Sequence, residues 1–153
     1  MAVKPKRQGG GEPTHWKVLP VPLFPDMWFN MVATPLGWQQ MHKHYNFDPI
    51  PNWPGDFGGR LNYIKSTTTS AKGWVMIINV ELMQEAKHPV ANLASFVAHE
   101  ASHMVDDIFE EIGESHPGTE TRSYLLDWAV AQAMIFYTDR FDFPTHNDKG
   151  RTR

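Results

Sequence analysis

The sequence contains no cysteine, no long apolar run and no excess of positive charge. Without cysteine, the chain has neither a disulfide bond nor a thiolate metal site, so any bound metal would have histidine and carboxylate ligands. No stretch of about 18 apolar residues is present, and the N-terminus lacks the apolar core and small-residue cleavage site of a secretory signal. We therefore expect no membrane span, no secretion by a signal peptide, and a cytoplasmic location.

The charge balance gives no support for nucleic-acid binding. Aspartate and glutamate total 17 residues against 14 lysines and arginines, which gives a formal net charge of −3. The basic cluster of Lys4, Lys6 and Arg7 lies in the glycine-rich segment 1–13. Such a segment is most simply a flexible arm.

The length and composition favour a single domain. The chain has 153 residues, of which 41% are apolar and 12% aromatic, and this is enough to bury one core. We expect this domain to span residues 14–138. Residues 139–153 are polar and are interpreted as a tail, docked through Phe141 and Phe143.

The first part of the domain, residues 14–58, is rich in proline and tryptophan. Nine of the twelve prolines precede Gly55. This density argues against long regular elements, so we expect extended segments that wrap a surface or a partner, with a short helix near Met27 to Ala33. The tryptophans either complete the domain core, which we favour, or form an interaction surface. They are Trp16, Trp28, Trp38 and Trp53.

A β-hairpin is predicted next. Residues Leu61 to Thr67 and Trp74 to Val80 are rich in β-branched and aromatic side chains, and the segment between them supplies turn residues that include Gly73. The second run is almost entirely apolar. It therefore suits a strand that packs against the helix that follows.

That helix is predicted from Val90 to Ile112. Apolar residues recur at helical spacing and form a broad stripe, whereas a second set of residues falls on a different face. The stripe consists of Leu93, Val97, Ala101, Met104 and Ile108, and the other face carries Asn92, Phe96, His99, His103 and Asp107.

Within this helix, His99, Glu100 and His103 form a His-Glu-x-x-His box. Two histidines four residues apart lie about 40° apart around a helix, so both imidazoles can reach one zinc ion. The intervening glutamate lies on the neighbouring flank, where it can act on a water molecule as a general base without binding the metal.

A catalytic zinc site needs a third protein ligand. A second helix is predicted from about Glu120 to Tyr137, with Thr119 as its N-cap, and Glu120 is the favoured ligand. His116, in the connecting loop, is the main rival and could instead stabilise an oxyanion; Asp127 is a further alternative. Two more histidines, His42 and His44, are expected to be exposed to solvent.

Other polar residues near the box have supporting roles in this hypothesis. Zinc-bound histidines usually donate their second ring N–H to an acceptor, for which Asp106, Asp107 and Asp127 are candidates. Tyr124 shares a helix face with Glu120 and Asp127. Its hydroxyl either stabilises an oxyanion or simply packs.

The box helix, the turn and the helix that opens with Glu120 together resemble the zincin metallopeptidases with a glutamate ligand, the gluzincins. The resemblance covers about residues 60–137. It implies a small α+β zincin-like domain, zinc as cofactor, ligands His99, His103 and Glu120, Glu100 as general base, and a peptide or protein substrate bound along the hairpin.

The order of these motifs is also similar to that of small phage-encoded proteins. The shared elements are the box, the turn Ile112 to Glu114, Pro117-Gly118, and a helix with Glu120 and Tyr124. This likeness suggests a virus source, with the host cytoplasm or the virion as location. Two hypotheses follow: a zinc metallopeptidase, or a non-catalytic structural or assembly protein of a phage particle, whose partners are neighbouring virion proteins.

Overall fold

The computed structural model describes residues 15–47, 49–54, 58–66 and 70–144. Four strands form one mixed sheet in the order β1-β2-β4-β3. They are β1 (Trp16–Val21), β2 (Phe24–Val32), β3 (Gly59–Lys65) and β4 (Lys72–Ile78). The strands β2 and β4 are parallel, whereas β1 and β3 run antiparallel to their neighbours. Because β3 pairs with β4 alone, it is an edge strand.

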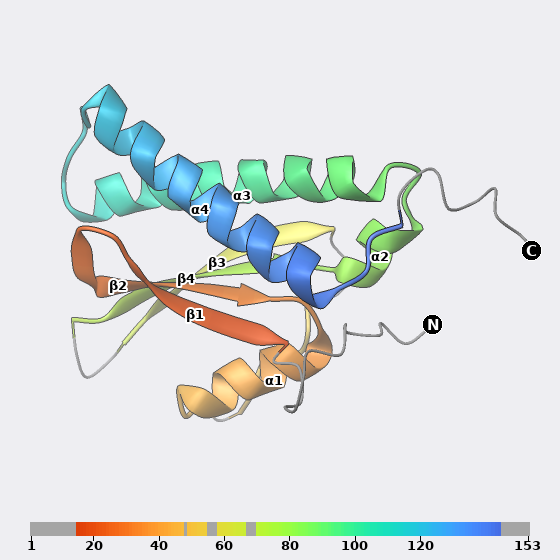
Figure 1. The fold of residues 1–153 in the computed structure, drawn as a ribbon. Helices are drawn as coiled ribbons and strands as arrows, with labels where there is room; N and C mark the ends of the chain where they lie inside the picture. The colour runs from red at the N-terminus through yellow and green to blue at the C-terminus, as the bar shows by residue number, and fades with distance from the viewer. Residues whose placement is uncertain (1–14, 48, 55–57, 67–69, 145–153) are drawn as a thin grey trace, which may run out of the picture.

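Four helices complete the α+β architecture that the sequence predicted. They are α1 (Pro35–His44), α2 (Val80–Glu85), α3 (Pro89–Glu111) and α4 (Thr119–Arg140). The long helices α3 and α4 cover one face of the sheet, and α1 lies on the opposite face (Figure 1). In the part of the chain that the structure describes, no helix is long and apolar enough to cross a membrane.

The sheet therefore has a buried cluster on each face. Inward side chains such as Phe29, Trp74 and Met76 pack with the apolar stripes of α3 and α4 in the larger cluster. On the other face, Val75 and Trp38 belong to a smaller cluster beneath α1. Since the central strands are covered on both sides, nearly every residue of β4 is buried.

The helix and hairpin predictions for the second half are confirmed. The box helix begins and ends one residue earlier than predicted, at Pro89 and Glu111. The hairpin pairs β3 with β4, and both strands begin two residues earlier than predicted. Thr119 was predicted as the N-cap of the next helix, but Gly118 holds that position and Thr119 is the first helical residue.

The predictions for residues 14–58 were wrong in detail. The described residues of this segment form regular elements that the proline density argued against, since they supply two of the four strands and all of α1. Residues 27–32, expected in a short helix, belong to β2. Trp38 is buried in the smaller cluster with Trp16 and Trp53 packed against it, so three of the four tryptophans contribute to the core, as favoured.

The chain end after α4 packs onto the domain. Phe141 is fully buried, and Phe143 packs against the same larger cluster. The polar tail was predicted from residue 139, but α4 continues to Arg140. The predicted arm at residues 1–13 and the end of the tail at 145–153 lie outside the described residues.

Candidate metal and catalytic site

The two box histidines lie side by side on the exposed surface of α3. The Nε2 atoms of His99 and His103 are 3.1 Å apart, and their rings are nearly perpendicular, with 4.7 Å between centroids. Their positions follow from the helix, because residues four apart are stacked on the same face. The predicted pair is therefore assembled, and both Nε2 atoms converge on one point.

This spacing fits one tetrahedral zinc ion. Zn–N bonds of about 2.0–2.1 Å at the tetrahedral angle separate two ligand nitrogens by about 3.3 Å. The observed separation of 3.1 Å between the Nε2 atoms is close to that value. The same separation also suits a hydrogen bond between the rings, because a neutral imidazole has one donor and one acceptor nitrogen.

Glu100 lies on the neighbouring flank of α3 and is buried, with 8% of its surface exposed. Phe96 and Asp107, four residues before it and seven after it, contact the β3–β4 hairpin, so Glu100 faces the same side. No described residue bonds to its carboxylate. Every fully buried polar side-chain atom in the described part has a hydrogen-bond partner, so the carboxylate oxygens remain accessible to solvent.

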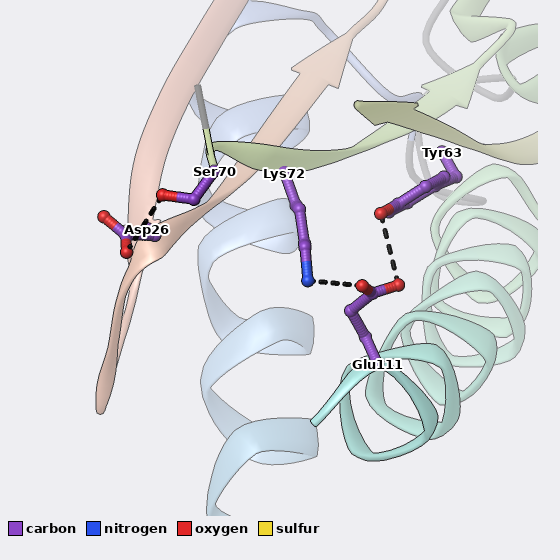
Figure 2. A network of polar contacts seen from close by, with 5 residues as sticks. All are labelled: Asp26, Tyr63, Ser70, Lys72 and Glu111. Carbon is purple, nitrogen blue, oxygen red and sulfur yellow. Dashed lines mark hydrogen bonds and ion pairs between the residues drawn. The ribbon is translucent and has the colours of Figure 1, made fainter. Parts of the chain in front are cut away.

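Polar contacts fix the C-terminal half of α3 against the hairpin. Glu111 pairs with Lys72 on β4 and accepts a hydrogen bond of 3.2 Å from the Tyr63 hydroxyl on β3, as Figure 2 shows. The Lys72 ammonium lowers the pKa of the Glu111 carboxyl. In the same view, Ser70 bonds to Asp26 of β2.

The other half of α3 is held by close packing. A Cβ atom added to Gly59 would lie 2.9 Å from Cδ1 of Phe96, so β3 and α3 approach each other closely there. The edge strand is therefore tied to the box helix before and after the histidine pair. This places an open strand edge beside the helix that carries the box.

Two of the predicted supporting carboxylates have other partners. Asp107 accepts a hydrogen bond of 3.2 Å from Nε1 of the buried Trp74. Asp106 accepts one of 2.6 Å from the Arg122 guanidinium of α4. Neither carboxylate bonds to a box histidine in this structure, and both contribute instead to the position of α3 relative to its neighbours.

The structure does not bring Glu120 to the histidine pair. The Arg122 side chain points toward α3, where it contacts Asp106. Glu120 precedes Arg122 by two residues, so the two side chains project from α4 in directions about 160° apart. Glu120, Tyr124 and Asp127 share one face of α4, as predicted, and that face is exposed. Among the described residues, no group of three His, Cys, Asp or Glu side chains could hold a metal ion.

His116 also lies apart from the box, in the exposed loop between α3 and α4. Its Nδ1 atom is 2.9 Å from the Ser115 hydroxyl, and its backbone N–H donates to the Glu114 carboxylate over 3.0 Å. These local bonds set the conformation of the loop. The structure therefore shows two of the expected metal ligands together, with Glu100 beside them.

Of the residues that line the depression between the hairpin and this end of α3, the sequence analysis singled out Asp107 but gave no role to Tyr63, Glu110 or Glu111. A hollow of about 370 Å³ is lined by Tyr63, Trp74, Asp107, Glu110 and Glu111. The alternation of β3 could have indicated that Tyr63 points toward the same side as the inward residues of β4. The contact with Glu111 depends on tertiary placement and has no local signal.

The chain was also compared with known proteins. No family model matches it, and neither a curated protein nor a solved structure does.

Proposed function

We propose that the chain is a zinc-dependent metallopeptidase of zincin type that cleaves a peptide or protein substrate. The observation that supports this most is the 3.1 Å separation of the His99 and His103 Nε2 atoms beside the buried Glu100. Coincidental surface histidines need not converge in this way. When bound, zinc would supply Lewis acidity, which lowers the pKa of water and polarises a carbonyl oxygen.

Glu100 is the proposed general base. Its carboxylate would accept a proton from the attacking water and return it to the leaving amine. Burial of most of the side chain restricts its rotamers, while its carboxylate oxygens keep the contact with solvent that a general base acting on water needs. The open edge of β3, held beside α3, suits an extended substrate that pairs with it as an additional strand.

Glu120 is the proposed third zinc ligand. Glu120 can join the histidines only if the first turn of α4 rotates or shifts, which would break the Arg122–Asp106 pair. That pair is solvent-exposed, so its loss costs little. His116 is the alternative, since a loop residue can move without disturbing either helix. Tyr124 would stabilise an oxyanion only if the same movement turned it inward.

The second candidate is a structural or assembly protein of a phage particle, in the host cytoplasm or in the virion. The order of the box, the turn and the helix with Glu120 and Tyr124, which resembles that of small phage-encoded proteins, is what suggests it. In that case the histidine pair would be a surface feature, and the domain would act through contacts with neighbouring proteins. Glu100 separates the two candidates, because catalysis needs it and assembly does not.

The test begins with the metal content of protein purified without added metal. We expect about one zinc per chain in the native protein, and loss of that zinc in His103→Ala. The matched control is His44→Ala, an exposed histidine on α1, which should retain it. Zinc retained in Glu120→Ala but lost in a His116→Ala variant would transfer the third-ligand role to His116.

Activity is then measured on unstructured protein substrates such as casein. Glu100→Gln should keep the zinc and lose nearly all cleavage. A native protein that contains no zinc would refute the proposal. A native protein that binds zinc but cleaves none of these substrates, together with unchanged assembly in Glu100→Gln, would support the structural candidate.

A further inference from the structure

A second groove lies along the edge strand, on the side of α1. It has a volume of about 490 Å³. Its walls are the strand β3 and the segment from α1 to Pro51. The residues from that segment are Trp38, His42, Phe47 and Pro51, and those from β3 run without interruption from Arg60 to Lys65.

The uninterrupted run shows how the groove is oriented. Successive side chains of a strand point to opposite faces, so a hollow on one face alone would touch every second residue. A hollow that touches six consecutive residues reaches the backbone of the strand over about 20 Å, and the side of β3 away from β4 is the open edge of the sheet. Residues 61–65 have no backbone hydrogen bond to any described segment except β4, so their outward N–H and C=O groups can pair with another strand.

His42 is built into the floor of this groove. It was expected to be exposed, but it is buried, with 4% of its surface accessible. Its Nδ1 atom lies 2.8 Å from the backbone oxygen of Trp38. A carbonyl oxygen only accepts, so Nδ1 carries the proton, and Nε2 of the neutral ring keeps its lone pair.

The Nε2 atom of His42 has no hydrogen-bond partner among the described residues. Every fully buried polar side-chain atom in the described residues has one, so Nε2 retains contact with solvent, and His42 is among the residues that line the groove. The ring is fixed between Trp38, at 4.0 Å between centroids, and Phe47, at 5.3 Å. Trp38 is itself anchored by a 2.7 Å hydrogen bond from Nε1 to the Pro51 oxygen.

We infer that this groove binds an extended polypeptide segment that pairs with β3 and places a tyrosine side chain against Phe47, where its hydroxyl donates to Nε2 of His42. The inference shares the open edge of β3 with the proposed function, but it needs neither zinc nor catalysis. It assigns a specificity pocket on the opposite face of the sheet from the histidine pair.

The chemistry of the pocket selects this side chain. The exposed ring of Phe47 favours an aromatic ligand, since offset or edge contacts between rings stabilise beyond area burial, while the buried Trp38 holds the His42 ring in place. A fixed lone pair on a floor that is otherwise apolar needs a donor, which phenylalanine lacks. Preorganisation by the bonds to Trp38 and Pro51 means that little rotamer entropy is lost when the ligand enters.

The test uses two fluorescein-labelled heptapeptides of alternating threonine and valine that differ only at the central residue, tyrosine or phenylalanine. Binding is measured by fluorescence anisotropy in EDTA, so that zinc and cleavage play no part. The native chain should bind the tyrosine peptide about fivefold more tightly, as one net hydrogen bond implies. Methylation of the backbone nitrogens of the peptide should weaken binding by preventing strand pairing.

The variant is His42→Asn. The amide nitrogen of asparagine takes the place of Nδ1 and can still donate to the Trp38 oxygen, but the variant has no atom at the position of Nε2. It should bind both peptides equally, whereas His44→Asn, two residues away and exposed, should keep the preference. If His42→Asn does not fold, the 15N chemical shift of Nε2 in the native chain takes its place and should move with the tyrosine peptide only.

Three results would overturn the inference. They are equal binding of the two peptides by the native chain, binding of neither peptide, and an unchanged preference in a folded His42→Asn variant. Because the measurement is made without metal, its failure leaves the zinc proposal untouched, and a zinc-free native chain leaves this inference untouched.

Discussion

Replacement of Tyr137 by phenylalanine tests how the sheet is joined to α4. Tyr137 is fully buried in the larger cluster. Its hydroxyl donates to the backbone oxygen of Val32 at 3.0 Å and to that of Met76 at 3.1 Å. These oxygens belong to the adjacent parallel strands β2 and β4, so one helical side chain bridges the centre of the sheet.

The expected loss of stability follows from these contacts. Phenylalanine fills the same space, so no cavity forms, and the loss comes from the hydroxyl alone. One proton is shared between two buried oxygens, and leaving a buried acceptor without its donor costs about 1–3 kcal/mol. We expect Tyr137→Phe to lower the free energy of unfolding by about 2 kcal/mol, and Tm by about 6 °C for a chain of this size.

Urea unfolding followed by circular dichroism measures this loss. The matched control is Tyr124→Phe on the exposed face of the same helix, where the same chemical change should alter stability by less than about 0.5 kcal/mol. The midpoint should fall in Tyr137→Phe with an unchanged m-value. Equal stabilities of Tyr137→Phe and the native chain would refute the role given to this hydroxyl.

The same variant should change the response to alkaline pH. Burial raises the pKa of the Tyr137 phenol well above its ordinary value. The unfolded chain therefore loses this proton above pH about 10 while the folded chain keeps it, so native stability is complete below that pH and declines above it. At pH 11 the native chain should lose about 1.4 kcal/mol from this group, a loss that Tyr137→Phe does not show. A constant difference between the two proteins from pH 8 to 11 would contradict this account.

Two further substitutions, each with a control, test contacts between the sheet and the segments beside it. Asn30 is buried, and its amide forms hydrogen bonds with three partners. Asn30→Ala should therefore lower the free energy of unfolding, measured in urea, by about 2–4 kcal/mol. Its control, Asn62→Ala on the edge strand β3, should lower it by less than about 1 kcal/mol. A Cβ atom on Gly37 would lie 2.1 Å from the backbone oxygen of His15, so Gly37→Ala should cost more than about 3 kcal/mol, because backbone must move. Gly113→Ala, where only the positive φ of 73° opposes the change, should cost about 1 kcal/mol; similar losses in both glycine variants would contradict the close contact.

The secondary structure was predicted most accurately where a regular pattern of apolar residues extends over many neighbouring residues. The apolar stripe of the box helix spans more than four turns, and the predicted stripe residues are all fully buried in α3. The hairpin was predictable because an apolar run long enough for one strand follows a turn containing glycine. Both signals depend on residues near one another in the chain, so tertiary contacts reinforce them and do not overrule them.

Proline count misled the prediction for the first half, because position matters more than number. Pro20 lies in the edge strand β1 next to a register shift, where a missing N–H breaks no ladder. Pro25 lies near the exposed start of β2. Pro35 is the first residue of α1 and directly follows the N-cap Thr34. At this position a backbone N–H has no hydrogen-bond partner within the helix, so proline loses nothing there.

The error about His42 follows from the missed helix. On α1, the residues Trp38, Met41 and His42 recur at helical spacing and face the sheet, whereas His44 points outward. Without the helix, two histidines separated by one residue look alike. Once α1 is recognised, their offset of about 160° around the axis separates a buried groove residue from an exposed one.

The candidate metal site shows the same division between local and tertiary information. The separation of His99 and His103 is set by four residues of one helix, so the sequence could predict it. Glu120 lies on another helix, whose rotation about its own axis is set mainly by buried residues such as Leu125 and Ala129, and to a smaller degree by the exposed contact between Arg122 and Asp106. Arg122→Ala removes this contact without touching any proposed ligand. If Glu120 is the third ligand, the variant should bind zinc more tightly than the native chain, because the start of α4 no longer has to give up an ion pair when it moves. Weaker zinc binding would instead indicate that zinc binds with α4 in the rotation seen in this structure.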